Sequence, residues 1–192
     1  VDLKIELVKM NDLEMTLKVT GRISANLNKT AKVNSTLQGR LIKLNFDIND
    51  HVKVGDVVGL VETPELLGKP LELKAPIDGV IIERKSTVGE LADKDKEIYI
   101  ISDPSQLWVI AEIKERDISA VKFGQEAAVK VLAYPEETFH GSIVRIANQV
   151  EPESRTLEVR IEISNVDGRL KSGMFADIEI TTKILEKVLL IS

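Results

Sequence analysis

The stretch "LQGRLIKLNFDINDHVKVGDVVGLVETPE" (Leu37–Glu65) can be written above "IDGVIIERKSTVGELADKDKEIYIISDPS" (Ile77–Ser105) without a gap. Gly39 then aligns with Gly79, which gives an offset of 40 residues between the two stretches. Apolar residues keep their positions in both stretches, while the charged residues change. A gapless register of this kind predicts an internal structural repeat.

Each copy of the repeat predicts two short strands joined by a polar turn. A glycine opens the first strand of each copy, Gly39 or Gly79, and further glycines, Gly55 and Gly89, mark the turns. We interpret these four residues as structural glycines of the two half-motifs. Because two strands cannot bury a face by themselves, the copies are expected to pack together as a small β-sandwich.

The composition of the 192-residue chain narrows the range of functions. A formal charge of −5 with both signs interspersed offers no basic surface for nucleic acid, and the four Phe, two Tyr and one Trp are too few for base stacking. The absence of cysteine excludes disulfides and thiolate metal sites. No apolar run approaches the roughly 18 residues of a membrane-spanning helix, so we expect any membrane anchor to lie outside this chain.

The residues after Pro104 follow a second strand pattern. In Leu107–Lys114 one set of alternate residues is wholly apolar and the other is mixed, which predicts a strand that is at least half buried. In Arg155–Ile163 apolar and polar residues alternate, which is typical of an antiparallel strand with one buried face. About six short strands between Leu107 and Thr182 favour a compact β-barrel over a flat sheet.

The connections of this second region are also predicted. Asp117 is expected to cap a single helical turn that Gly124 ends, and "PEET" (Pro135–Thr138) is expected to join two strands. Asp167-Gly168 predicts a tight turn before the last strand.

No constellation of catalytic or metal-binding residues is found in the sequence. His51 and His140 are the only histidines, and neither has a second ligand at metal-binding spacing. Met10 and Met15 could bind a soft metal ion, but filling a gap in a core is the commoner use of methionine. We therefore predict no enzyme activity, no cofactor and no metal site.

The two half-motifs resemble those of biotinyl/lipoyl domains. In carrier proteins of that family, a lysine at a tight hairpin takes lipoate or biotin, usually in a setting such as "ETDK". Here Glu62-Thr63 matches the "ET", but Glu65 stands at the lysine position and Lys69 lies beyond it. The resemblance implies a lipoyl-like fold, and it leaves a lipoate or biotin carrier domain of a multienzyme complex as an alternative function.

Together the two patterns are similar to the membrane fusion proteins, also called periplasmic adaptors. The second region matches them at Gly124-Gln125, Arg155-Thr156, Asn165 with Asp167-Gly168, and Leu170 with Gly173-Met174. The resemblance implies an all-β chain with a split lipoyl-like sandwich (33–105) and a small antiparallel β-barrel (106–182). It also implies part of a membrane-proximal β domain, made of residues 1–32 and 183–192.

The resemblance further implies a function. A periplasmic adaptor is a non-enzymatic subunit of a tripartite efflux or export system, and it links an inner-membrane transporter to an outer-membrane exit duct. A transporter of the resistance-nodulation-division type and a homo-oligomeric adaptor in the assembled pump are expected. The protein would then be periplasmic, anchored to the inner membrane by a segment outside this chain. A soluble export module that binds a substrate and passes it on is a third interpretation.

One departure from the family lies between the two half-motifs. Membrane fusion proteins carry a long α-helical hairpin there, whereas this sequence has only "PELLGKP" (Pro64–Pro70) and no long helical pattern elsewhere. Either the adaptor lacks the hairpin or the hairpin has been removed, and the first is favoured because this connection is not a Gly/Ser linker.

Without the hairpin, this connection becomes the end of the lipoyl-like domain. Glu65, Leu66, Leu67 and Lys69 would then be placed to meet the duct or a neighbouring subunit. The alternative is that both leucines fold back and cap the core of the sandwich.

Overall fold

The computed structural model describes the backbone of residues 9–190 and the side chains of residues 15–182. The chain divides into two compact units. The first consists of the residues up to Ser24, Trp108–Ser164 and the residues from Leu170 onward. The second consists of Ala25–Leu107 and Asn165–Arg169. The predicted all-β class is confirmed, because the described residues contain strands and only three short 3-10 segments, η1 (Leu27–Lys29), η2 (Pro64–Leu66) and η3 (Glu115–Ala120). No helix in this part of the chain is both long and apolar enough to cross a membrane.

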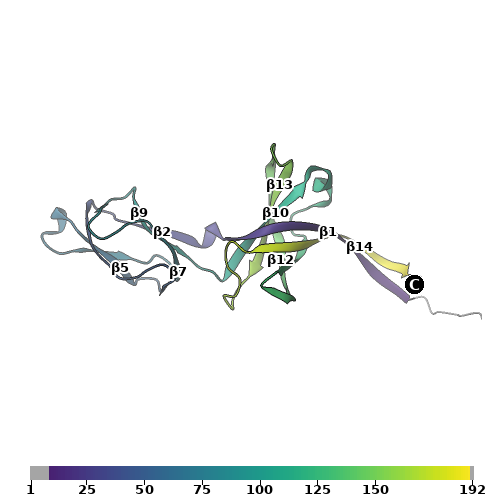
Figure 1. Ribbon diagram of the computed structural model, residues 1–192, viewed down its shortest axis with the longest axis horizontal. Helices are drawn as coiled ribbons and strands as arrows, with labels where there is room; N and C mark the ends of the chain where they lie inside the picture. The colour runs from purple at the N-terminus through teal and green to yellow at the C-terminus, as the bar shows by residue number, and fades with distance from the viewer. Residues whose placement is uncertain (1–8, 191–192) are drawn as a thin grey trace, which may run out of the picture. The chain divides into compact units, whose positions relative to one another are not determined.

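The unit that contains the repeat is a sandwich of two four-stranded sheets (Figure 1). One sheet has the order β2 (Thr30–Asn34), β9 (Glu97–Ser102), β7 (Gly79–Arg84) and β4 (His51–Val52). The other has the order β6 (Leu71–Lys74), β5 (Val57–Glu62), β3 (Gly39–Leu44) and β8 (Leu91–Ala92).

The strands confirm the predicted repeat. The bounds of β3, β4 and β5 recur 40 residues later as those of β7, β8 and β9. The repeat also includes one further strand in each copy, β2 in the first and β6 in the second. Each of these strands precedes the stretch that was compared in the sequence. Each sheet combines both copies, since β9 and β7 of the second copy lie between β2 and β4 of the first.

Hydrogen bonds between the copies are reciprocal. The backbone N–H of Asn49 donates to the carbonyl of Ile81 at 2.8 Å, and the N–H of Gly89 donates to the carbonyl of Leu41 at 2.7 Å. Returning bonds run from Ile81 N–H to the Asp50 carbonyl (3.0 Å) and from Leu41 N–H to the Glu90 carbonyl (2.9 Å). Each turn therefore satisfies backbone groups on the first strand of the other copy.

Tyr99 is the largest fully buried side chain of this core. Its hydroxyl donates to the carbonyl of Phe46 at 2.6 Å, which ties a strand of the second copy to a loop of the first. Burial raises the pKa of Tyr99, so the phenol remains a hydrogen-bond donor. The other buried residues of the cluster are apolar: Val33, Leu41, Val52, Val58, Val61, Leu73, Ala75, Ile81, Ala92, Ile98 and Ile101.

The four half-motif glycines serve two different needs. A Cβ on Gly39 would lie 2.3 Å from the carbonyl oxygen of Glu62, and one on Gly79 would lie 2.5 Å from that of Ser102, so both positions require close backbone approach. Gly55 and Gly89 instead adopt positive φ angles of 90° and 96°. Such angles favour glycine because other residues place Cβ too close to the backbone.

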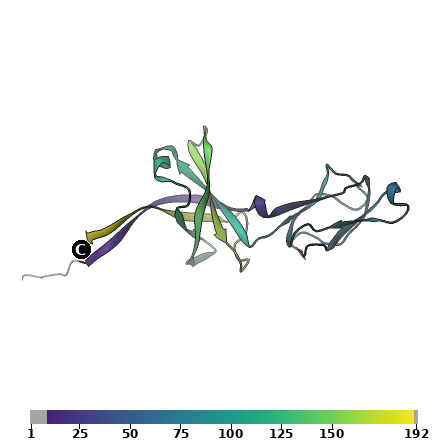
Figure 2. The ribbon, with the colours of Figure 1, turned by 180° about the vertical axis from the view of Figure 1, so that it is seen from behind.

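The other unit is a closed barrel with the order β1-β10-β13-β12-β11-β14 (Figure 2). Its inner face is apolar, since Val109, Ala111 and Ile113 of β10 and Val159 and Ile161 of β13 are fully buried. The strands are β1 (Lys9–Ala25), β10 (Gln106–Lys114), β11 (Glu126–Val131), β12 (Tyr134–Glu151), β13 (Thr156–Ser164) and β14 (Phe175–Leu190).

The first strand differs from its predicted place in a separate domain. Residues 16–22 of β1 pair with residues 175–181 of β14 in the barrel, and residues 25–32 belong to the sandwich unit. Only β1 joins β10 to β14, so the barrel would keep two open edges without it. Both views show β1 and β14 continuing together as a two-stranded ribbon (Figures 1 and 2).

Two predicted connections of the barrel are wrong. The hairpin between β11 and β12 turns at Leu132-Ala133, because Val131 pairs with Tyr134, and "PEET" lies within β12. The short helix begins at Glu115 after Lys114, which makes no side-chain cap, so Asp117 lies inside the helix and does not cap it. Gly168 does close the predicted turn, since its N–H donates to the Asn165 carbonyl at 2.9 Å and its φ is 63°.

The pairing of Gly89 with Asn49 predicts the outcome of two substitutions. The repeat places Asn49 (φ 75°) opposite Gly89, and a Cβ at Gly89 would meet no atom within 4 Å. Backbone strain alone should therefore lower the free energy of unfolding by about 1–2 kcal/mol in Gly89→Ala. Gly89→Asn should cost clearly less, because Asn tolerates this conformation. Urea denaturation measures both, and equal losses would contradict this account.

Glu97 predicts a pH dependence of stability. Its carboxylate pairs with Lys32 of β2 and, at 2.6 Å, with Lys85 after β7. The hydrogen bond from Lys32, followed by that from Lys85, lowers the pKa of Glu97. A lowered pKa means that the stabilisation is present above the unfolded-state pKa, about 4.3, and is lost as pH falls through the folded-state value.

The urea midpoint of Glu97→Gln should therefore differ from that of the parent protein most at about pH 6–7, and the difference should shrink below about pH 4. Glu62→Gln is the matched control, because Glu62 is exposed and has no ion pair among the described residues. A pH-independent difference for Glu97→Gln would show that the pairs do not contribute.

Candidate functional site

Residues 63–70, here called the tip, connect β5 to β6. Thr63 is buried, and its hydroxyl accepts a hydrogen bond from the N–H of Glu65 at 3.4 Å. Pro64 occupies the start of η2, where its missing N–H and fixed φ are compatible with a helical turn. The tip therefore begins with one capped turn of 3-10 helix.

The tip then reverses through two residues with positive φ. Leu67 has φ 47° and ψ 46°, and Gly68 has φ 86°. Lys69 closes the turn, because its N–H donates to the carbonyl of Leu66 at 3.0 Å. A left-handed conformation costs a non-glycine residue roughly 1–2 kcal/mol, so Leu67 holds local strain at an end of the sandwich.

The two leucines of the tip have different environments. The side chain of Leu67 is 94% exposed, whereas Leu66 is 37% exposed. The alternative that both leucines cap the core therefore fits Leu66 in part and does not fit Leu67. Leu67 is therefore the more exposed of the two leucine side chains of the tip.

The repeat relates the tip to the opposite end of the sandwich. The carboxylate of Asp103 accepts from the N–H of Ser105 at 2.9 Å, as Thr63 accepts from Glu65 40 residues earlier. Likewise the N–H of Lys29 donates to the Asn26 carbonyl at 2.8 Å, as Lys69 donates to Leu66. At that opposite end the chain enters and leaves the unit. The counterpart of Leu67 there is Leu27, which is also exposed (67%).

The loop brings the four predicted tip residues together, whereas the half-motif glycines lie elsewhere in the sandwich. Glu65 and Lys69 are exposed and have no ion pair among the described residues, so both charges face solvent beside Leu67. Within the part of the chain with described side chains, no three His, Cys, Asp or Glu residues gather as a metal site. The tip therefore exposes the Leu67 side chain together with one acidic and one basic residue.

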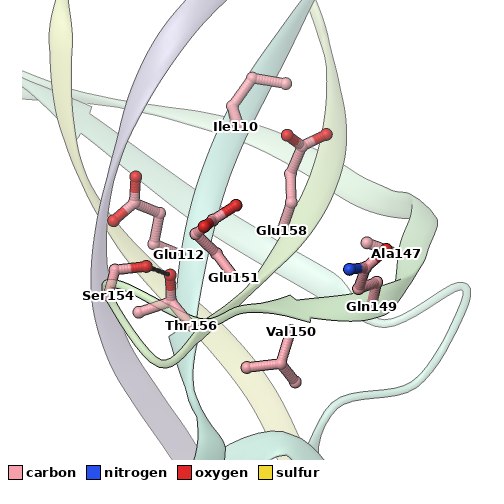
Figure 3. Close-up of a pocket in the computed structure, with 9 residues that line it drawn as sticks. All are labelled: Ile110, Glu112, Ala147, Gln149, Val150, Glu151, Ser154, Thr156 and Glu158. Atoms are coloured by element: carbon pink, nitrogen blue, oxygen red, sulfur yellow. Dashed lines mark hydrogen bonds between the residues drawn. The ribbon is translucent and has the colours of Figure 1, made fainter.

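The barrel carries a second feature that sequence reasoning missed. On its outer face a hollow of about 460 Å³ lies over β10, β13 and the end of β12 (Figure 3). Alternation in "WVIAEIK" places Ile110 and Glu112 on one face of a strand. It could not show that the end of β12 lines the same hollow as these two residues. The hollow is lined by Ile110, Glu112, Ala147, Gln149, Val150, Glu151, Ser154, Thr156 and Glu158.

The chain thus combines a lipoyl-like sandwich with a closed six-stranded barrel. Comparison with known families gives the particular class. Residues 29–103 match the family model described as RND MFP, barrel-sandwich hybrid domain, and residues 106–183 match the one described as CusB-like, beta-barrel domain. The chain belongs to the RND membrane fusion protein family.

Individual relatives agree with this assignment. The cation efflux system protein CusB of Escherichia coli K12 is 33% identical over 127 residues, which are 66% of this chain and 31% of CusB. The cobalt-zinc-cadmium resistance protein CzcB of Cupriavidus metallidurans is 24% identical over 57% of this chain and 21% of its own length. The chain thus spans about a third or less of these two relatives.

A solved structure shows the same fold. The crystal structure of ZneB from Cupriavidus metallidurans superimposes with a TM-score of 0.72 at 21% identity, covering 89% of this chain and 100% of that one. The absence of a long helix among residues 9–190 agrees with an adaptor that lacks the α-helical hairpin.

The tip geometry predicts opposite effects for its two leucines. Leu67→Asn should leave the free energy of unfolding unchanged or raise it by about 1 kcal/mol, because Asn tolerates the left-handed conformation better. Leu66→Ser should lower it by about 1 kcal/mol through loss of partly buried apolar area. Urea denaturation of both variants checks this. A loss in Leu67→Asn as large as that in Leu66→Ser would mean that Leu67 packs on the sandwich.

Proposed function

We propose that this chain is the adaptor of a tripartite RND efflux system, joining an inner-membrane transporter to an outer-membrane exit duct from the periplasm. Family matches over both the sandwich and the barrel are the observation that carries the proposal. The adaptor acts by holding its partners together, and it does no chemistry of its own.

We further propose the finer arrangement. The tip meets the exit duct or a neighbouring copy of the adaptor in a homo-oligomer, with Leu67 as the apolar anchor and Glu65 and Lys69 beside it. Leu66 is the less exposed leucine of the tip and is not part of the proposed contact. The paired ends of β1 and β14, residues 9–15 and 183–190, belong to the membrane-proximal domain, and a segment outside this chain anchors the protein to the inner membrane. The names of CusB and CzcB support metal cations as the exported class.

The position of Lys69 in the tip keeps a lipoate or biotin carrier as the second candidate. Glu65 at the carrier position and the following barrel argue against it. Intact-mass analysis of protein made together with an active lipoyl or biotinyl ligase separates the two, since an added lipoyl or biotinyl group on Lys69 would establish the carrier function.

Leu67→Ser in the full-length adaptor tests the tip directly. Because Leu67 is exposed, the variant should keep its melting temperature within about 2 °C of the parent value. It should lose co-purification with the exit duct and lose cation tolerance in cells, while it still co-purifies with the transporter.

Leu27→Ser is the matched control, because Leu27 is the exposed counterpart of Leu67 at the other end of the sandwich. It should retain the duct and cation tolerance. Unchanged duct binding and unchanged tolerance in Leu67→Ser would remove the tip from the docking surface and leave the family-level proposal intact.

A further inference from the structure

We propose that the outer face of the barrel binds an extended segment of a partner protein that presents an apolar side chain next to Lys or Arg. The apolar side chain packs on Phe175 and Ile110, and the basic group lies between Glu112 and Glu151. This inference goes beyond the proposed function of the tip and rests on other residues.

Two hollows that meet on β10 lie over five neighbouring strands of the barrel, β12, β13, β10, β1 and β14. The hollow of about 460 Å³ reaches from β10 over β13 to β12. A second hollow of about 660 Å³ reaches from β10 over β1 to Phe175. Both are lined by Ile110 and Glu112, so they meet on β10. Five strands at about 4.8 Å spacing span roughly 19 Å along the sheet, which accommodates a few residues of extended chain.

Closure of the barrel limits how a partner segment can bind to its outer face. A ring of six strands has no free edge, so a partner cannot be added as a further strand. Recognition must therefore come from side chains on the outer face.

Phe175 supplies the apolar anchor of this face. It is 64% exposed although it begins a strand whose next residue, Ala176, is buried. The guanidinium of Arg22, its register partner on β1, lies 4.9 Å from the ring centroid and holds the ring in place. Phenylalanine and arginine are both enriched at protein interfaces relative to the rest of the surface.

Glu112 and Glu151 determine the charge of the partner. Both are exposed, both line the first hollow (Figure 3), and neither has an ion pair within residues 15–182. Glu158 on the same face is already bound by Arg160, whose Nε lies 2.9 Å from its carboxylate. Uncompensated carboxylates in a concave surface concentrate negative potential and attract a cationic group. The first hollow therefore favours a basic group, whereas Arg22 lines the second hollow, where the apolar side chain is placed.

The only tryptophan of the chain offers a reporter of binding. Trp108 is buried on β10, and the Arg160 guanidinium lies 4.9 Å from its ring centroid. Because Arg160 is tied to Glu158 at the hollow, a ligand there should alter the fluorescence of Trp108.

The test is a titration with the peptide acetyl-Phe-Lys-Phe-Lys-amide, followed by Trp108 fluorescence. For the parent protein we expect a saturable change in fluorescence. The double variant Glu112→Gln with Glu151→Gln should raise the dissociation constant about fivefold or more, and so should Phe175→Ser. Glu126→Gln with Glu136→Gln removes the same charge from exposed positions outside the hollows and should leave affinity unchanged. Leu67→Ser should also bind normally, which separates this face from the tip.

Three outcomes would overturn the proposal. The first is the absence of saturable binding. The second is equally tight binding of acetyl-Ser-Lys-Ser-Lys-amide together with no effect of Phe175→Ser, which would show charge attraction only. The third is self-association in sedimentation that Phe175→Ser abolishes, which would assign the face to a second copy of this chain. Melting curves of each variant exclude unfolding as the cause.

Discussion

The reciprocal hydrogen bonds between the two half-motifs are the constraint on which the sandwich depends. The turn that contains Asn49 forms hydrogen bonds with the backbone of Ile81, and the turn that contains Gly89 forms them with the backbone of Leu41. A single copy would leave the backbone groups of the buried residues Leu41 and Ile81 without these partners. An unpaired buried group costs about 1–3 kcal/mol. The interleaved strand order follows, because each copy supplies the flanking strands of the sheet whose centre the other copy forms.

The same symmetry gives the sandwich two equivalent ends. At one end the chain enters and leaves beside Lys29 and Asp103, whose backbones are joined by a 2.8 Å hydrogen bond. At the other end the tip connects the corresponding strands, β5 and β6, by a short loop. A segment can thus pass through either end without changing the sheets, which explains why this position can carry a long hairpin in some adaptors and a short loop here. The short loop must reverse within two residues, and this requirement places Leu67 in its strained, exposed conformation.

The sequence was sufficient for the features that the repeat encodes. Paired glycines and aligned apolar residues gave the strands of the sandwich, their turns and the place of Glu65, Leu66, Leu67 and Lys69 in one loop. It did not distinguish Leu66 from Leu67, because their burial depends on a turn of left-handed backbone that neighbouring leucines do not signal. The same limit applies to the hairpin at Leu132-Ala133, where pairing within the sheet overrides the turn preference of "PEET". The place of β1 in the barrel depends on ring closure, which no local pattern contains.

Ring closure also shapes the barrel face on which the second binding surface is proposed. A small closed barrel requires strongly tilted and twisted strands, and irregular pairing is the usual means of bending them. Here β12 shifts register against β13 between Ile143 and Arg145 and again between Ile146 and Val150. Gly141 and Gly21 meanwhile let neighbouring backbones approach closely, since a Cβ on either would lie within 2.5 Å of a carbonyl oxygen. The hollow beside Gln149 and Val150 lies where β12 makes the second of these register shifts. The barrel thus loses the edges on which partners could pair and gains a concave face that can recognise them only by charge and shape.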